Sequence, residues 1–403
     1  MRLSVCYLLS RLPLGECGVL VGGSATNSVS LAFELKRQGV PVNIVAPIST
    51  GDIINLKGHP LEEIMFPIPI TKTSLVSRGI SSVIALRGSI KKLMREKGYN
   101  VVHSHSGTYP YALATLAVDG RSCARLHSLY CPLGATGGVY SGWWERPLVA
   151  RHIFNRLDRV VGVSDNVYRS ILGAGVSESK LNLNTMSVDT MRFRPREKNT
   201  EPRYFKGREA VRILFIGNGS VEKGLIDLLQ AVGSLIGSGY PIELVGTLEN
   251  ASSLSEYREG EETARKFISK NGLDGCVTLT GLVGSIEELY AEADIVVVPW
   301  KTSRGPSDYP MVILEGMAMG KCIVSTPVGG CRELLGDGKA GLLTGGFGTK
   351  HIEDALARIV KNPEERAAMG RAALSESSKL SIELSARRMI SLYESILSEK
   401  VYK

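Results

Sequence analysis

Short strand-like runs alternate with helical segments along this chain of 403 residues. The runs NVVHSHS and DIVVVPW read as buried strands, whereas residues 24–39 and 78–98 carry apolar side chains at the spacing of amphipathic helices. A strand followed by a helix and another strand is the repeating unit of a parallel sheet covered by helices. The sequence therefore predicts an α/β protein with doubly wound sheets.

The alternation is interrupted at residues 195–210, which are charged, contain proline and show no periodicity. A chain of this length exceeds one ordinary core, so two domains are expected. We predict two Rossmann-like domains facing a cleft, at residues 1–195 and 196–385. The final helix, within residues 386–403, follows no strand of its own and is expected to cross back to the N-terminal domain.

The cysteines and the N-terminus bear on the compartment. Seven scattered cysteines have no CxxC spacing and no histidine partners at metal-site spacing, which fits a reducing compartment. Arg11 and Glu16 interrupt the apolar N-terminus too early for a signal peptide, and no apolar run is long enough to span a bilayer. We therefore expect a cytoplasmic protein without a bound metal.

The positive charge lies in the first half of the chain. Residues 1–195 hold 22 Lys and Arg against 12 Asp and Glu, a net charge of +10, whereas residues 196–403 hold 26 against 28, a net charge of −2. This asymmetry suggests an anionic partner for the first half.

The helix predicted at 78–98 concentrates that charge. Its apolar side chains, expected to face the sheet, are Ile80, Val83, Ile84, Ile90 and Met94. Its other faces carry Arg78, Arg87, Lys91, Lys92, Arg95 and Lys97. Each basic side chain near an anionic bilayer contributes about 1 kcal/mol, so we hypothesise peripheral attachment to the inner face of the membrane, with Trp143 and Trp144 entering the interface. The alternative is a solvated helix face that serves only solubility, with a soluble acceptor.

An acidic residue lies inside the apolar stretch 307–330. Ser307 or Asp308 can cap a helix that begins near Met311, and the free N–H groups at a helix N-terminus attract phosphate. Glu315 follows one turn later on the same face, where its carboxylate could accept hydrogen bonds from a ribose. The alternative is a buried structural glutamate paired with a basic side chain.

Two glycine-containing loops follow predicted strands. In GNGSVEKG, residues 217–224, Lys223 can neutralise phosphate, but Glu222 breaks the dinucleotide fingerprint and Gly224 breaks the Walker pattern. In GVLVGGSATNS, residues 18–28, Gly22 and Gly23 precede a helix. For both loops, a plain strand-to-helix turn is the alternative to a phosphate site.

Three histidines are predicted at the ends of N-terminal strands. They are His103, His105 and His127, and each is a candidate acid, base or sugar contact. Strand alternation places His103 and His105 on one side of the sheet. No further zinc ligand accompanies them, so one of this pair is expected to be structural.

Together these segments resemble a known family, the retaining nucleotide-sugar glycosyltransferases of family 4, which have the two-Rossmann GT-B fold. The resemblance covers nearly the whole chain. It is carried in the correct order by GGSATNSVSLAFELKRQG, VVHSHS, RLHSL, GNGSVEKG, ADIVVVPW and YPMVILEGMAMGKCIVSTPVGG.

The resemblance implies roles for particular residues. Lys223 and the backbone N–H groups of Met311 and Val312 would contact the donor diphosphate, and Glu315 would hold the ribose. The other implied contacts are His127 near the transferred sugar, Gly22 and Gly23 on the donor, and Leu282 near the base. We take His105, Tyr109 and Trp143 as candidates on the acceptor side.

The chain departs from the family pattern at two positions. Asn218 replaces an arginine that helps to hold the diphosphate, and Ser307 replaces the first glutamate of a pair, with Asp308 beside it. Three explanations stay open: Asp308 substitutes for the glutamate with a local shift, the donor sugar differs, or the protein is a catalytically impaired homologue.

The implied reaction moves a sugar from a UDP- or GDP-linked donor to an acceptor hydroxyl with retention of configuration, in glycan, glycolipid or cell-surface polysaccharide synthesis. No DxD triad occurs, so no metal is invoked, and no cofactor is expected beside the donor. The expected partners are the nucleotide sugar and a glycan or lipid-linked acceptor, without nucleic acid. The alternatives are a nucleotide-sugar epimerase or hydrolase and a binding subunit that has lost catalysis.

Overall fold

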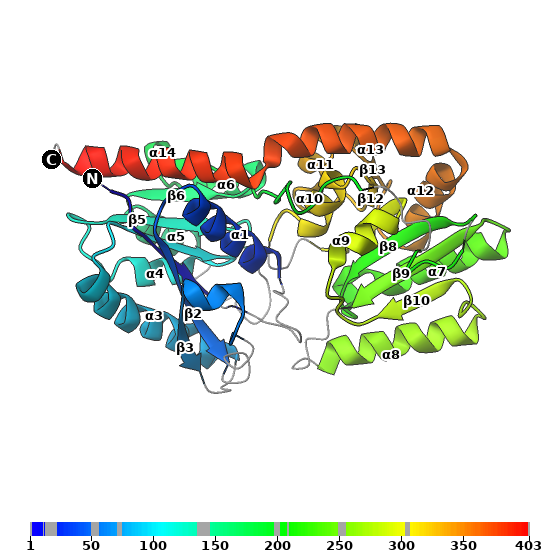
Figure 1. Cartoon of the computed structure of the whole chain (residues 1–403), viewed down its shortest axis with the longest axis horizontal. Coiled ribbons are helices and arrows are strands. Elements are labelled where there is room, and N and C mark those ends of the chain that lie inside the picture. Colours follow the sequence, from blue (N-terminus) through cyan, green and yellow to red (C-terminus); the bar gives the residue numbers. More distant parts are fainter. Residues whose placement is uncertain are drawn as a thin grey trace. The chain divides into compact units, whose positions relative to one another are not determined.

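The computed structural model describes residues 2–10, 12, 22–49, 56–70, 75–134, 146–196, 202–207, 209–248, 255–302 and 307–401. The chain divides into two compact units, each built on one sheet (Figure 1). Unit 1 contains Met1–Ser187, Arg304–Asp308 and Ile382–Lys403, and unit 2 contains Val188–Ser303 and Tyr309–Ser381. The chain thus passes between the units a few residues before the predicted boundaries at 195 and 385.

Unit 1 has a parallel sheet of seven strands in the order β3-β2-β1-β4-β5-β6-β7. The strands are β1 (Val5–Leu9), β2 (Val42–Ser49), β3 (Met65–Ile70), β4 (Val101–Ser106), β5 (Ala124–Leu129), β6 (Arg159–Gly162) and β7 (Leu181–Leu183). The helices are α1 (Gly23–Arg37), α3 (Leu75–Lys97), α4 (Ala112–Thr115), α5 (Pro147–Phe154), α6 (Asp165–Gly173) and α14 (Ile382–Val401). The predicted α/β class and parallel pairing are confirmed.

The side chains of strand β1 alternate between two cores in unit 1. Val5 and Tyr7 belong to one cluster with buried residues of α1 and α14, whereas Cys6 and Leu8 belong to a second cluster with residues of α3. Helices therefore cover both faces of the sheet. Helix α14 contributes Met389 and Tyr393 to the first cluster, so the last helix returns to the N-terminal unit as predicted.

Strand β3 was not expected from the sequence. Its sequence, MFPIPI, contains Pro67 and Pro69, which cannot donate to a neighbouring strand. Among the described strands, β3 lies at the edge of the sheet and pairs with β2 alone. Proline is tolerated there because one side of an edge strand needs no partner.

The prediction for the apolar face of helix α3 was partly wrong. Ile90 is fully buried, but Ile84 is 64% exposed, and Leu86 and Leu93 occupy the core instead. Residues 86, 90 and 93 follow a spacing of four and three, whereas residue 84 lies about 200° around the helix from residue 86. The side chain of Ile80 lies outside the described residues.

Unit 2 has a parallel sheet of six strands in the order β10-β9-β8-β11-β12-β13. The strands are β8 (Val211–Gly217), β9 (Ile242–Leu248), β10 (Val277–Thr280), β11 (Ile295–Val298), β12 (Cys322–Ser325) and β13 (Leu342–Leu343). The helices are α7 (Leu225–Gly237), α8 (Ser255–Lys270), α9 (Ile286–Glu292), α10 (Met311–Ala318), α11 (Cys331–Leu334), α12 (Thr349–Lys361) and α13 (Pro363–Ser377). Helices α7, α8 and α12 pack on one face in a single apolar cluster.

On the other face of this sheet, helix α10 packs closely against the strands. A Cβ atom added at Gly316 would lie 2.7 Å from Ile323 of β12 and 3.3 Å from Val296 of β11. A side chain at position 316 would therefore displace the helix. Because glycine has no side chain, α10 can lie closer to the sheet than any other residue at position 316 would allow.

The charged segment 195–210 is docked on unit 2 over its described part. The carboxylate of Glu292 accepts hydrogen bonds from the backbone N–H groups of Arg203 and Tyr204, at 2.8 and 2.9 Å. The carboxylate of Glu243 likewise accepts from Lys206 and Gly207. Because both glutamates are buried, this stretch is held on the domain surface instead of forming a free linker.

Candidate functional site

The carboxyl ends of parallel strands meet at one edge of a sheet, and loops that follow them carry most ligand sites in open α/β sheets. In unit 2 these loops include the segments that follow β8, β10 and β11 (Figure 1). They bring six predicted donor residues to the same edge: Asn218, Lys223, Leu282, Met311, Val312 and Glu315. Leu282, half-buried just after β10, offers apolar surface there.

The loop after β8 is tightly built. The side-chain oxygen of Asn218 accepts a hydrogen bond from the backbone N–H of Ser220 at 3.0 Å, and Asn218 is almost fully buried. Gly224 has φ of +70°, and a Cβ there would lie 2.0 Å from the carbonyl oxygen of Pro299. Asn218, predicted on the donor, thus supports the turn, and Gly224 permits contact with the loop after β11.

Lys223 lies over an aromatic ring. Its ammonium nitrogen is 3.2 Å from the centroid of the Trp300 ring, a cation–π contact between the loops after β8 and β11. Sequence reasoning missed Trp300 as a site residue, although it is the last residue of the predicted strand DIVVVPW and so was expected at the same edge. Because the indole ring is buried, it supports the lysine side chain from a fixed position.

Helix α10 begins at Met311 as predicted, but its N-cap is Pro310, without a side-chain cap. The predicted cap by Ser307 or Asp308 was wrong, because the Asp308 carboxylate accepts hydrogen bonds from α6 instead. The N–H groups of Met311 and Val312, in the first turn, have no acceptor within the helix. No acidic side chain occupies that turn. The helix N-terminus therefore presents a partial positive charge at the same sheet edge as Lys223.

Glu315 lies one turn into α10 and is half-buried. The hydroxyl of Tyr290 donates to its Oε2 at 2.8 Å. Burial raises the pKa of Glu315 to about 7, against the opposing effects of Tyr290 and of the Arg192 guanidinium. Glu287 also acts on Glu315. Burial would raise the pKa of Glu287 itself, but its ion pair with Arg192 holds that pKa below the ordinary value of a glutamate.

In unit 1, Gly22 and Gly23 form the N-terminus of α1. Gly22 is the N-cap with φ of +95°, where other residues are strained, and a Cβ there would meet no atom of the described residues within 4 Å. As in α10, no acidic side chain occupies the first turn.

His127 lies within β5 and not after it, and it is fully buried. Its Nδ1 is 2.8 Å from the hydroxyl of Ser104, which itself accepts from Thr115, and its ring stacks on Phe154. Burial lowers the pKa of His127 to about 3, so the imidazole is neutral. The Ser104 hydroxyl has two acceptors, Nδ1 of His127 and the carbonyl oxygen of Leu126, and Nε2 of His127 is buried without a partner among the described residues.

His103 and His105 lie within β4, on the opposite face from His127. Their rings are 4.1 Å apart, as alternation predicted. His103 bonds through both nitrogens, to Tyr393 at 2.7 Å and Ser128 at 2.9 Å, so it is the structural member of the pair. His105 contacts the Tyr130 hydroxyl, and its Nε2 is buried without a partner among the described residues.

Tyr109 and Trp143 are the other two residues predicted on the acceptor side. Tyr109 is buried, with its ring edge-on to Phe154. Trp143 lies outside the described residues, as does Trp144. His103, His105 and Tyr109 therefore lie in the interior of unit 1.

Ser307 and Asp308 are buried in unit 1. The two carboxylate oxygens of Asp308 accept hydrogen bonds from Ser164 at 2.7 Å and from Asn166 at 3.0 Å, and its N–H donates to the carbonyl oxygen of Tyr130. Ser164 also caps α6 by accepting from Val167. Asp308 is therefore engaged with this unit through its backbone and its side chain.

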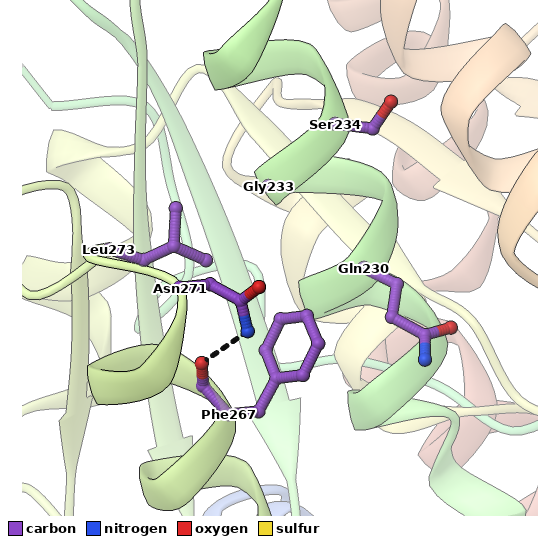
Figure 2. Close-up of a pocket in the computed structure, with 6 residues that line it drawn as sticks. All are labelled: Gln230, Gly233, Ser234, Phe267, Asn271 and Leu273. Carbon is purple, nitrogen blue, oxygen red and sulfur yellow. Dashed lines mark hydrogen bonds between the residues drawn. The ribbon is translucent and has the colours of Figure 1, made fainter.

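A pocket of about 340 Å³ lies elsewhere on unit 2, between α7 and the end of α8 (Figure 2). Its lining is Gln230, Gly233, Ser234, Phe267, Asn271 and Leu273. These residues lie toward the amino ends of the strands, because α7 runs back from its start beside the carboxyl end of β8. The pocket is thus separate from the loops that hold Lys223 and Glu315.

Two features of the described residues bear on chemistry. They contain no group of three His, Cys, Asp or Glu side chains placed to hold a metal ion. They also include no helix with the length and apolar character needed to cross a bilayer.

Two family models match the chain. Residues 21–192 match the model described as Glycosyltransferase Family 4, and residues 210–362 match the model described as Glycosyl transferases group 1. The two matches fall in the two sheet-containing units and together span most of the chain.

Individual relatives agree with these models. D-inositol 3-phosphate glycosyltransferase of Corynebacterium jeikeium is 26% identical over 93% of this chain and 92% of its own. A GDP-mannose-dependent alpha-(1-6)-phosphatidylinositol monomannoside mannosyltransferase of Mycobacterium tuberculosis is 29% identical over 62% of this chain and 65% of its own. The crystal structure of Anabaena HepE in complex with UDP has a TM-score of 0.73 at 15% identity, over 98% of this chain and all of that chain. This chain therefore belongs to glycosyltransferase family 4, the group 1 glycosyl transferases, and is a sugar-transferring enzyme of the GT-B fold.

Proposed function

We propose that the enzyme transfers a sugar from a nucleoside diphosphate sugar to an acceptor hydroxyl with retention of anomeric configuration, and that unit 2 holds the donor. The observation that supports this is one sheet edge carrying three complementary groups: Lys223, the N-terminus of α10 and Glu315. A cation and a helix N-terminus suit a diphosphate, and a carboxylate suits a ribose diol.

The proposed chemistry follows from where charge develops. Departure of the diphosphate builds negative charge on its oxygens, which Lys223 and the first-turn N–H groups of α10 would stabilise. In the retaining mechanism that we propose, the acceptor attacks from the face that the diphosphate leaves, and a phosphate oxygen takes the acceptor proton. This route requires no protein nucleophile and no bound metal.

His127 has a limited part in this proposal. Nε2 of its neutral imidazole has no partner among the described residues and is the nitrogen left for one hydrogen bond to a sugar hydroxyl, but its low pKa makes it a poor base or acid near neutral pH. We therefore propose a contact with the transferred sugar for His127 and no proton transfer.

The relatives guide the choice of substrates. One relative is named for D-inositol 3-phosphate, a second is a GDP-mannose-dependent phosphatidylinositol monomannoside mannosyltransferase, and Anabaena HepE is in complex with UDP. We propose a UDP- or GDP-linked hexose as donor and an anionic polyol or lipid-linked glycan as acceptor. Nucleic acid is not proposed as a partner.

Membrane contact is proposed for the basic face of α3. Lys91, Lys92, Arg95 and Lys97 are exposed, and Lys92 is 3.9 Å from Glu96. Arg87 is excluded from this face because its guanidinium donates to the carbonyl oxygen of Leu113. Lys91, Lys92 and Arg95 lie within about 100° of one another around the helix, whereas Lys97 lies on the side of Leu86 and Ile90. The first three side chains would meet anionic headgroups at the cytoplasmic face of the membrane, where a lipid-linked acceptor would lie.

The experiment that tests the proposal incubates the protein with a panel of UDP- and GDP-linked hexoses and polyol or lipid-linked acceptors. Nucleotide release and the anomeric configuration of the product are followed by NMR. We expect release that depends on the acceptor and an α product from an α donor. Release without any acceptor would instead indicate a nucleotide-sugar epimerase or hydrolase, and an inverted product would refute the proposed mechanism.

A further inference from the structure

We propose that Tyr290 is a positioning residue for the donor: its hydroxyl holds the Glu315 carboxylate ready to accept hydrogen bonds from the donor ribose. The proposal rests on the proposed function, because it takes Glu315 as the ribose-binding group. Tyr290 would act through Glu315 and would not itself touch the nucleotide. Both residues belong to unit 2.

The geometry fixes the direction of this hydroxyl. Tyr290 donates to Oε2 of Glu315 at 2.8 Å, and the carbonyl oxygen of Val312 is a second acceptor at 3.3 Å. The tyrosine ring is fully buried in α9, and the ring of Phe193 packs edge-on against it with centroids 5.9 Å apart. A ring enclosed in this way cannot swing its hydroxyl elsewhere without opening the core.

The hydrogen bond leaves room for a ligand. Tyr290 is the only side chain among the described residues that donates a hydrogen bond to the Glu315 carboxylate, and it uses one lone pair of one oxygen. An ionised carboxylate has about four lone-pair sites on two oxygens. Oε1 and the second lone pair of Oε2 can therefore accept from two adjacent hydroxyls, as a ribose diol requires.

The charge on Glu315 depends on its neighbours. The charged groups that act on it are Arg192, which favours the ionised form, and Glu287, which disfavours it. These two are themselves ion-paired, so their effects on Glu315 partly cancel. Strands β11 and β12 contribute apolar side chains, Val296 and Ile323, to the packing of α10.

Tyr290 therefore has a particular electrostatic effect. Burial raises the pKa of Glu315 to about 7, and donation from Tyr290 favours the ionised form. Without the hydroxyl the pKa would rise further, and a smaller fraction of the carboxyl group would be ionised at neutral pH. A protonated carboxyl group loses one of its acceptor oxygens and binds a diol less well.

The test is Tyr290→Phe, which removes the hydroxyl and keeps the ring. The dissociation constants of UDP and GDP are measured by calorimetry from pH 6 to pH 9, as the ratio of the variant to the unaltered protein at each pH. We expect a ratio of about ten at pH 7, the size of a hydrogen bond to a charged group. The ratio should be smaller at pH 9, where Glu315 is ionised in both proteins, and the loss that remains there reports the lost orientation of the carboxylate.

Two control variants accompany the measurement. Tyr240→Phe makes the same chemical change just before the amino end of β9, away from the carboxyl ends where Glu315 lies, and should leave the ratio at one. In a Glu315→Gln background, Tyr290→Phe should add no further loss, because a residue that acts through Glu315 has nothing left to position.

The outcomes separate this inference from the proposed function. If Tyr290→Phe binds like the unaltered protein at every pH, or if it weakens binding by the same factor in the Glu315→Gln background, the positioning role is wrong. If Glu315→Gln weakens binding while Tyr290→Phe does not, only this inference fails. If Glu315→Gln binds normally, or the unaltered protein binds neither nucleotide, the proposed function fails and the inference fails with it.

Discussion

Single side chains at the edge of the unit 2 sheet acquire their chemistry from neighbours that are distant in sequence. Lys223 is oriented by Trp300, and Glu315 by Tyr290, with Arg192 and Glu287 adjusting its charge. In each case the charged group contacts a buried aromatic residue: the ammonium of Lys223 lies over the Trp300 ring, and the carboxylate of Glu315 accepts from the Tyr290 hydroxyl. The aromatic residues thus form the rigid layer beneath the proposed donor contacts.

At the residue scale we predict that Trp300→Leu weakens UDP or GDP binding about three- to tenfold. The substitution removes the aromatic face under Lys223, which is valued at about 0.5–2 kcal/mol, while leaving an apolar side chain of moderate size. Calorimetry measures the change. Trp300→Phe keeps a ring beneath the ammonium and should lose less. Equal losses in the two variants, or none in either, would mean that the ring does not orient the lysine.

A second prediction at this scale concerns pH and stability. The folded-state pKa of Glu315 is about 7 and lies above its unfolded value near 4.5, so the folded state retains this proton when the unfolded state has lost it. Stability from this group therefore falls as pH rises from about 4.5 to 7 and then levels off. Glu315→Gln removes this loss.

Thermal unfolding at pH 5 and pH 8 checks the prediction. Glu315→Gln should gain stability relative to the unaltered protein at pH 8 and gain much less at pH 5. The difference is at most about 3 kcal/mol, because each pKa unit corresponds to about 1.4 kcal/mol. A constant offset between the two proteins at both pH values would contradict a raised pKa.

At the scale of elements, much of each sheet could be predicted from the sequence. The strands β8 and β11 and the start of α10 at Met311 were found because apolar runs and a proline at the helix entrance are local signals. Edge strand β3 was missed because Pro67 and Pro69 oppose a strand unless it lies at an edge, and position in a sheet is not a local property.

The site was predicted in part for the same reason. Lys223 and Glu315 lie in short motifs, so their spacing to a strand or helix end could be read directly. Tyr290 could not be found in this way, since its contact with Glu315 crosses from α9 to α10. The histidines were placed too far along their strands, because β4 and β5 extend through Ser106 and Leu129.

The short segment before α10 gives a prediction at the element scale. Asp308→Ala would leave the buried hydroxyl of Ser164 without this acceptor and would remove the contact with the exposed Asn166, at a cost of about 1–3 kcal/mol. Thermal unfolding should show this loss. Asp165→Ala, beside it on α6 and partly exposed, is the matched control and should change stability little.

The same variant separates two roles for Asp308. If its carboxylate served the donor sugar and not this anchor, Asp308→Ala would lower turnover with no loss of stability. Both effects together would indicate that the anchor also supports the transfer.

At the scale of the whole molecule, charge and sites are divided between the two units. The proposed donor groups lie in the half of the chain with a net charge of −2, and the exposed lysines of α3 lie in the half with a net charge of +10. This division suits a protein that takes a nucleotide sugar on one unit and meets an anionic surface or acceptor with the other.

The membrane proposal is tested by co-sedimentation with vesicles. We expect binding to vesicles rich in phosphatidylserine, no binding to phosphatidylcholine vesicles, and release by salt. The triple variant Lys91→Glu, Lys92→Glu and Arg95→Glu should stay in solution. Its control reverses Lys266, Lys270 and Arg371 of unit 2, which changes net charge equally and should not prevent binding. Equal loss in both variants, or no binding at low salt, would refute contact through α3.

The most direct measurement is the affinity of UDP and GDP for the unaltered protein, Lys223→Ala and Glu315→Gln, determined by calorimetry in the presence of EDTA. We predict that one of the two nucleotides binds without metal and that each substitution weakens this binding by about 2–4 kcal/mol, roughly 30-fold or more. Circular dichroism should confirm that both variants remain folded. If neither nucleotide binds without a divalent cation, or if both variants bind as tightly as the unaltered protein, the donor site is not at Lys223, α10 and Glu315.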